Sequence, residues 1–160
     1  MLNEVSVCKI FTFDAAHQLV GHKGKCSNLH GHTYKLEVVL KGIPSVQEGH
    51  SDEGFVIDFS EIKARVREVL IDRLDHAFLA TGNEPVLESL YSSGSKVAHL
   101  SFRTTAENLS AYAAYELKKA GLPLYSVKLW ETPTSWAEVL AEDIPLEGPS
   151  YRRYGGCDCE

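Results

Sequence analysis

Two stretches of alternating apolar and polar residues constrain the fold most, because both alternating rows lead into histidines. Residues 5–13 and 33–41 each show the period of two that is typical of a strand with one buried face. The buried row of the first stretch continues to His17, and that of the second extends back to His32 and His30. Since residues two apart share a face of a strand, pairing the stretches as a hairpin brings the three imidazoles together at one rim of a sheet.

Three neutral imidazoles are typical ligands of Zn²⁺, and a three-ligand site keeps a fourth position for water or substrate. The sequence therefore predicts a metal site formed by His17, His30 and His32. Cys26 lies in the loop before His30 and leaves two possibilities. It is either a fourth ligand that closes a structural site, or a thiolate held above the metal as a base. His22 is out of phase with the strands, and we interpret it as a loop residue.

Two helices are predicted by apolar residues at helical spacing behind capping signals. Asp58 followed by Glu61 resembles a capping box, and the apolar residues that follow predict a helix over 59–73. A second capping signal at 104–107 begins the next helix. In this interpretation Glu107 is the third residue of the second capping box.

The remaining elements complete the fold prediction. Residues 124–131 and 136–141 predict two more strands around a short turn, whereas 81–96 is expected to be irregular and 97–102 to hold a short extended piece. The order strand, strand, helix, helix, strand, strand predicts an α+β domain. We expect a four-stranded antiparallel sheet with both helices on one face.

The size of the chain, 160 residues, fits one domain, which we place at 1–144 with a peripheral tail at 145–160. The net charge of −6 argues against a nucleic-acid partner. No apolar run approaches the roughly 20 residues of a membrane span, so no membrane partner is expected. The first residues do not resemble a signal peptide, and the four cysteines do not resemble a disulfide framework. We therefore expect a cytoplasmic protein with reduced thiols.

Further acids, bases and thiols lie far from the histidines in sequence. Asp75 can orient the imidazole of His76 and stabilise its charged form, although capping of the preceding helix is an alternative. Glu131 continues the buried row of its strand, so its carboxylate needs a partner. That partner is either a bound heterocycle with two N–H donors or a buried arginine. Cys157 and Cys159 have the spacing of a metal or redox pair, and we interpret them as part of the tail.

Six blocks of this sequence together resemble the 6-pyruvoyl-tetrahydropterin synthase and 6-carboxy-tetrahydropterin synthase family. They are Ala-Ala-His at 15–17, Cys-Ser-Asn-Leu-His-Gly-His at 26–32, Gly-Phe-Val-Ile-Asp-Phe at 54–59, Leu-Asp-His at 74–76, Thr-Ala-Glu-Asn at 105–108 and Trp-Glu-Thr at 130–132. One such block can occur by chance, whereas six in order are highly specific. The resemblance implies the tunnelling fold, in which trimers form a barrel and pair into a homohexamer. Active sites then lie between subunits.

The resemblance also implies the chemistry of the histidines. By it, His17, His30 and His32 bind zinc, and Cys26 is the proton acceptor. The implied substrate is 7,8-dihydroneopterin triphosphate, whose side chain loses triphosphate. The protein would then be a zinc-dependent lyase.

The later blocks supply the other implied roles. Asp75 and His76 form a proton relay, and Glu131 anchors the pterin and can join the relay. Thr105 and Glu107 are expected at the substrate.

The product divides the family between pyruvoyl products and a carboxy product released with acetaldehyde. Only three residues separate Cys26 from His30 here, which is similar to the bacterial carboxy enzymes of queuosine (7-deazaguanine) biosynthesis. Animal pyruvoyl enzymes have a longer insertion there. We expect the carboxy enzyme; the alternatives are the pyruvoyl enzyme and a non-catalytic pterin- or purine-binding module with structural zinc. Thr104 in place of the family's frequent proline, the segment 81–96 and the Cys-x-Cys tail depart from the common pattern.

Overall fold

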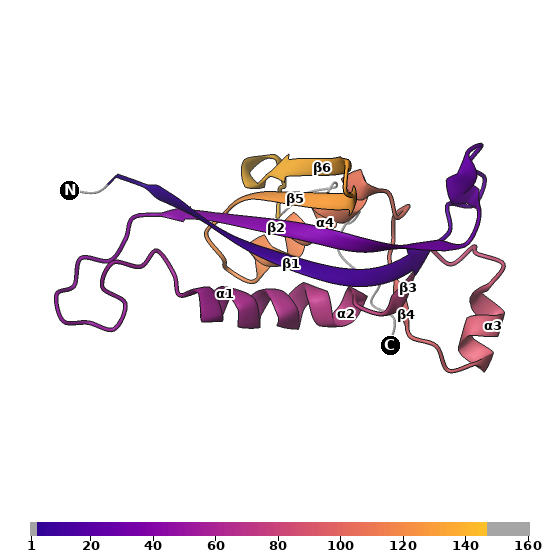
Figure 1. The fold of residues 1–160 in the computed structure, drawn as a ribbon, viewed down its shortest axis with the longest axis horizontal. Helices are drawn as coiled ribbons and strands as arrows, with labels where there is room; N and C mark the ends of the chain where they lie inside the picture. The colour runs from indigo at the N-terminus through magenta and orange to yellow at the C-terminus, as the bar shows by residue number, and fades with distance from the viewer. Residues whose placement is uncertain (1–2, 147–160) are drawn as a thin grey trace.

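The computed structural model describes residues 3–146, and a long hairpin spans the molecule (Figure 1). Its strands are β1, Val5–His17, and β2, His30–Gly42, which pair antiparallel along their whole length. The register places His17 opposite His30 and Ala15 opposite His32. The predicted hairpin is therefore confirmed, with both strands extending into the histidines.

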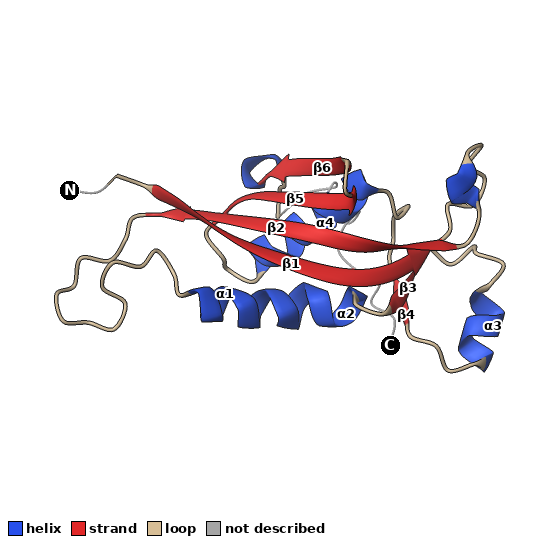
Figure 2. Ribbon diagram, in the orientation of Figure 1, coloured by secondary structure: helices blue, strands red, loops and turns tan. Residues whose placement is uncertain are grey.

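The sheet has six strands in the order β4-β3-β1-β2-β5-β6, not the four expected (Figure 2). β5, Leu124–Thr132, and β6, Ser135–Leu140, extend the antiparallel part as predicted. β3, Ala77–Ala80, and β4, Val97–His99, instead run parallel to β1 and make the sheet mixed. The purely antiparallel ββααββ prediction was wrong because every residue of β3 is buried, so it shows no alternation.

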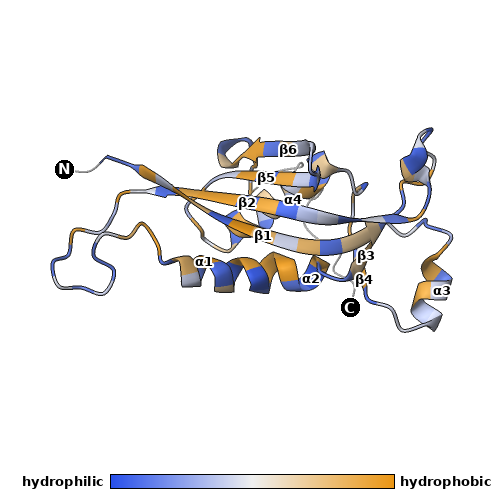
Figure 3. Ribbon diagram, viewed as in Figure 1, coloured by the Kyte–Doolittle hydropathy of each residue, from blue (hydrophilic) through white to orange (hydrophobic). Residues whose placement is uncertain are grey.

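The first predicted helix is continuous over 59–74 but contains a wider turn. It consists of α1, Phe59–Val66, a π-helical turn at Arg67–Ile71, and α2, Asp72–Leu74. Polar and apolar bands alternate along it in Figure 3, as expected for a helix with one buried face. The carboxylate of Asp58 accepts a hydrogen bond from the backbone N–H of Ser60, which confirms the predicted cap.

The second predicted helix, α4, covers Ala106–Lys119. Its N-cap is Thr105, whose hydroxyl accepts from the N–H of Asn108 at 3.4 Å. Glu107 is therefore the second residue of the helix, and its expected place as third residue of a capping box was wrong. This shift of one position leaves the carboxylate of Glu107 free of the capping contact.

The first helix, which runs over 59–74, and α4 pack on the same face of the sheet and form the core with it. Fully buried residues of this core include Tyr34 and Leu36 from β2, Ile62 from α1 and Tyr112 from α4. None of the helices in the described part of the chain is long and apolar enough to cross a membrane.

The segment 81–96, expected to be irregular, contains the short helix α3, Leu87–Ser92. It lies beyond the end of the hairpin (Figure 1), where Leu87 packs with Phe78 and Ala80 in a second, smaller apolar cluster. Cys157 and Cys159 fall outside the described residues, and the expected boundary between domain and tail stays a prediction.

Candidate active site

Three imidazoles converge at the end of the β1–β2 hairpin, and we call His17, His30 and His32 the histidine cluster. Each offers one ring nitrogen, and these nitrogens all lie within 4.8 Å of one another. The Nε2 atoms of His17 and His30 are 3.1 Å apart. This arrangement follows from strand register, because His17 faces His30 directly and His32 lies two residue pairs along, on the same face.

The hydrogen bonds behind the cluster decide which nitrogens are available. His17 Nδ1 lies 2.9 Å from the backbone carbonyl of Thr104, and His30 Nδ1 lies 2.7 Å from that of Asn28. A carbonyl oxygen only accepts, so each Nδ1 carries the proton. In the neutral rings both Nε2 atoms therefore present lone pairs to each other, an arrangement that a shared cation stabilises.

The surroundings disfavour the charged form of two imidazoles of the cluster, those of His17 and His32. Burial lowers the pKa of His17 to about 4, and the neighbouring His30 acts in the same direction. Burial also lowers the pKa of His32, against the opposing effect of Glu131. Neutral imidazole is the form that binds metal, so these residues are prepared as ligands at neutral pH.

A metal ion fits this donor set. His32 Nε2 is buried and has no hydrogen-bond partner among the described residues, which is costly for a polar atom unless a ligand satisfies it. The nearest carboxylate is Glu131, whose Oε1 lies 3.8 Å from His17 Nε2 and 3.7 Å from His32 Nε2. Three imidazoles beside one carboxylate match the ligand preferences of zinc.

A cavity of about 260 Å³ opens beside the cluster. Its lining residues come from the 18–29 loop, the start of α4 and the β5–β6 hairpin; the ones predicted as site residues are Cys26, Thr105, Glu107 and Glu131. The Cys26 thiol is free and half-buried, and it is not one of the clustered metal-ligand atoms. Its position favours a role at the substrate over that of a fourth ligand.

Asp75 and His76 contact each other as predicted, but neither lines the cavity beside the histidine cluster. The Asp75 carboxylate is 2.9 Å from His76 Nδ1 and accepts a 3.0 Å hydrogen bond from the backbone N–H of Asp14. Burial disfavours the charged form of Asp75, but these hydrogen bonds outweigh it and hold the pKa of the carboxyl below its usual value. The adjacent side chains thus make the contact that a relay requires.

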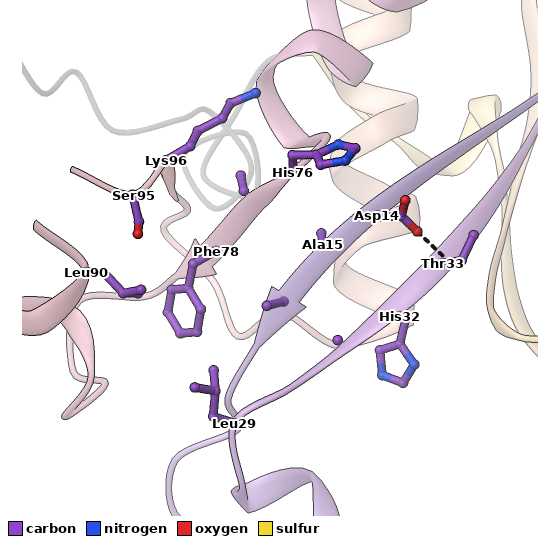
Figure 4. A pocket seen from close by; sticks show the side chains of 13 residues that line it. Asp14, Ala15, Leu29, His32, Thr33, His76, Phe78, Leu90, Ser95 and Lys96 are labelled. Carbon is purple, nitrogen blue, oxygen red and sulfur yellow. Dashed lines mark hydrogen bonds between the residues drawn. The ribbon is translucent and has the colours of Figure 1, made fainter. Parts of the chain in front are cut away.

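The Asp75–His76 turn and the histidine cluster use opposite faces of β1. The carboxylate of Asp14 lies within 4.8 Å of the Asp75 and His76 donor atoms, and it accepts from Thr33 on the outward row of β2 (Figure 4). His17, in contrast, belongs to the inward, buried row. A second cavity of about 680 Å³ is lined by His76, Phe78, Leu90 and Lys96, and also by His32 of the histidine cluster.

Two residues of the site were missed by sequence reasoning. Thr104 is fully buried, and its hydroxyl lies 3.1 Å from His17 Nδ1; its replacement of a frequent proline was the available signal. Tyr34 is also fully buried, and its hydroxyl has no hydrogen-bond partner among the described residues. Burial, followed by the charge of Glu131, raises the pKa of Tyr34. In the sequence Tyr34 continues an apolar row of β2, and that pattern does not indicate an unpaired hydroxyl.

Comparison with known proteins agrees with the geometry. The chain is 42% identical over 137 residues to 6-carboxy-5,6,7,8-tetrahydropterin synthase of Haemophilus influenzae, covering 82% of this chain and 96% of the relative. Identity to the Synechocystis protein of the same name is 37% over 133 residues, covering 82% and 89%. The solved 6-pyruvoyl tetrahydropterin synthase of Caenorhabditis elegans matches with a TM-score of 0.64 and 25% identity, over 87% of this chain and 96% of that one. The family model for 6-pyruvoyl tetrahydropterin synthase matches residues 6–142. The chain therefore belongs to the 6-pyruvoyl tetrahydropterin synthase family.

Proposed function

We propose that the protein is a zinc-dependent 6-carboxy-5,6,7,8-tetrahydropterin synthase. It converts 7,8-dihydroneopterin triphosphate to 6-carboxytetrahydropterin with release of acetaldehyde and triphosphate, in queuosine biosynthesis. The observation that carries the proposal is the cavity in which Cys26 and Glu131 lie beside the histidine cluster. The names of the relatives from Haemophilus influenzae and Synechocystis support the carboxy product.

The histidine cluster would hold the zinc through the three Nε2 atoms. When bound, zinc polarises oxygens of the substrate side chain and makes the neighbouring C–H bonds more acidic. The backbone carbonyls behind His17 and His30 keep both rings in the tautomer that this requires.

Glu131 is proposed to orient the pterin ring. Its carboxylate is about three-quarters buried at the cavity wall, and no arginine pairs with it among the described residues. A carboxylate there can accept two parallel hydrogen bonds from a heterocycle that offers adjacent N–H donors. Thr105 and Glu107, at the first turn of α4, line the same cavity and complete the binding surface.

Cys26 is proposed as the base that moves protons at the substrate side chain. Its thiol is half-buried and lines the cavity between the 18–29 loop and Glu131. A thiolate in this position removes a proton from an acidified carbon and returns it to a neighbouring one. The 3₁₀ turn Lys25–Ser27, closed by the hydrogen bond from Ser27 N–H to the Gly24 carbonyl, fixes the thiol at the cavity mouth.

The Asp75–His76 turn is proposed to reach a site across a subunit boundary. It lies on the outward face of β1, whereas Cys26 borders the cluster on the inward side. A homohexamer of two trimers gives each site a Cys26 from one copy and a His76 from another. The substrate would then be enclosed only in the assembled protein.

Product analysis tests the function directly. The zinc-loaded protein is incubated with 7,8-dihydroneopterin triphosphate, and acetaldehyde, the 6-carboxy product and triphosphate are quantified. We expect the three in equal amounts. A 6-pyruvoyl product without acetaldehyde would identify the other branch of the family, and pterin binding without turnover would identify a binding module.

A further inference from the structure

We propose that Lys96, from the segment 81–96, is a positioning residue that fixes the direction of the His76 imidazole. The proposal rests on the role assigned above to the Asp75–His76 turn. It gives a function to a residue of the segment between β3 and β4.

Lys96 binds the carbonyl end of the peptide bond between Asp75 and His76. Its ammonium donates to the carbonyl of Asp75 at 2.8 Å and to that of Asp72 at 2.7 Å. Both carbonyls lie at the C-terminal end of α2, where helix carbonyls have no partner within the helix. A cation is favourable at this end of a helix dipole.

The other end of the same peptide bond is also held. The N–H of His76 donates to the carbonyl of Asp14 at 2.7 Å. Lys96 and Asp14 therefore clamp one peptide plane from its two sides. With that plane fixed, the only backbone rotation that aims the imidazole is φ of His76.

The φ angle of His76 lies in the left-handed region of backbone conformation, which is unusual for a residue other than glycine. His76 has φ of 58°, and it is the only residue other than glycine with positive φ in the described chain. This conformation costs roughly 1 kcal/mol for a residue with a side chain, so surrounding contacts must maintain it. Two such contacts are the clamp on the peptide and the 2.9 Å contact between His76 Nδ1 and the Asp75 carboxylate.

Lys96 is itself held in place by the sheet. Its carbonyl accepts a 2.9 Å hydrogen bond from the N–H of Phe78, immediately before β4 begins. Figure 4 shows Lys96 and His76 in the same part of the 680 Å³ cavity, with Phe78 below them in that view. The pairing of β3 with the residues that begin β4 therefore holds the backbone of Lys96 beside the Asp75–His76 turn.

The test compares Lys96→Met, which removes the donor, with Lys96→Arg, which retains it. Lys63→Met, at an exposed position of α1, is the matched control for loss of one positive charge. Zinc content, kcat and KM for dihydroneopterin triphosphate, the pH profile of kcat and the ¹⁵N resonances of the His76 ring are measured in all three.

We expect Lys96→Met to lower kcat by about tenfold with KM and zinc unchanged, because a displaced catalytic group costs rate and not binding. The His76 ring resonances and the pH profile should shift in Lys96→Met and return toward wild type in Lys96→Arg. If Lys96→Met does not fold, Lys96→Gln replaces it. Unchanged ring resonances and pH profile in a folded Lys96 variant would overturn the proposal.

Failure of the proposed function gives a different result. If His76→Ala retains full turnover, the turn has no catalytic role. The ring resonances of Lys96→Met still report whether Lys96 orients His76.

Discussion

The histidine cluster and the Asp75–His76 turn share strand β1 but are built by different means. The cluster is set by register along one hairpin, and burial lowers the pKa of His17 and of His32. The turn depends on contacts from Asp14 and Lys96, which are distant in sequence, and it holds an ionised carboxylate. The proposed ligands are thus fixed by local strand pairing, whereas the proposed Asp75–His76 relay is fixed by tertiary contacts on the opposite face of β1.

The largest effect is expected from His32→Ala. Its Nε2 lies among the clustered nitrogens, so the variant should lose bound zinc and all measurable turnover. Metal analysis after dialysis and the product assay check this. His22→Ala, in the exposed loop nearby, is the control and should keep both.

Cys26→Ala separates metal binding from chemistry. We expect zinc to remain bound while kcat falls by about 100-fold or more, the range of a lost general base. Zinc content and turnover are measured on the same sample. Loss of zinc together with turnover would instead show that the thiol is a ligand and that the site is closed.

Mixing two inactive variants tests whether the two faces meet between subunits. After subunit exchange, Cys26→Ala and His76→Ala together should recover activity at about a quarter of the sites if each site draws on two copies. The control pair, Cys26→Ala with Glu131→Gln, alters one cavity and should stay inactive. No recovery in the first pair would place both groups in a single chain.

Thr104→Val should weaken zinc binding by about tenfold, since groups behind a metal-bound histidine tune its affinity. The loss is partial because the carbonyl of Thr104 still accepts from His17 Nδ1. Competition with a zinc chelator measures the change. Thr104→Ser retains the hydroxyl at 3.1 Å from the ring and should bind zinc as the wild type does.

The smallest effect concerns Glu84, which follows β3, and the pH dependence of the free energy of unfolding. Burial disfavours the charge on Glu84, but hydrogen bonds from Thr81 and Gly82 outweigh it and lower the pKa of Glu84. Its contribution to stability is therefore present above the unfolded pKa and lost as pH falls through the folded one. Glu84→Gln should reduce the free energy of unfolding by about 1 kcal/mol at pH 7 and flatten its decline below about pH 5. Urea unfolding at several pH values tests this, and an unchanged slope would contradict it.

The sequence predicted what strand phase and helix spacing determine. The three imidazoles meet because His17 continues one buried row and His32 another, and both helices begin at capping residues. β3 was missed because four consecutive buried residues carry no period. Lys96 was missed because its contacts are with backbone carbonyls, which no side-chain pattern reveals.

The short length of β3 has a consequence for the isolated chain. β1 has thirteen residues, but β3 pairs only with Ala15, Ala16 and His17. The outer backbone groups along the rest of β1 have no strand beside them in the described structure. An open ladder of this length is a template for another strand and a hazard for aggregation. We therefore expect that dilution, by dissociating the proposed oligomer, exposes this strand edge. Specific activity and resistance to aggregation should then fall together as the protein concentration is lowered.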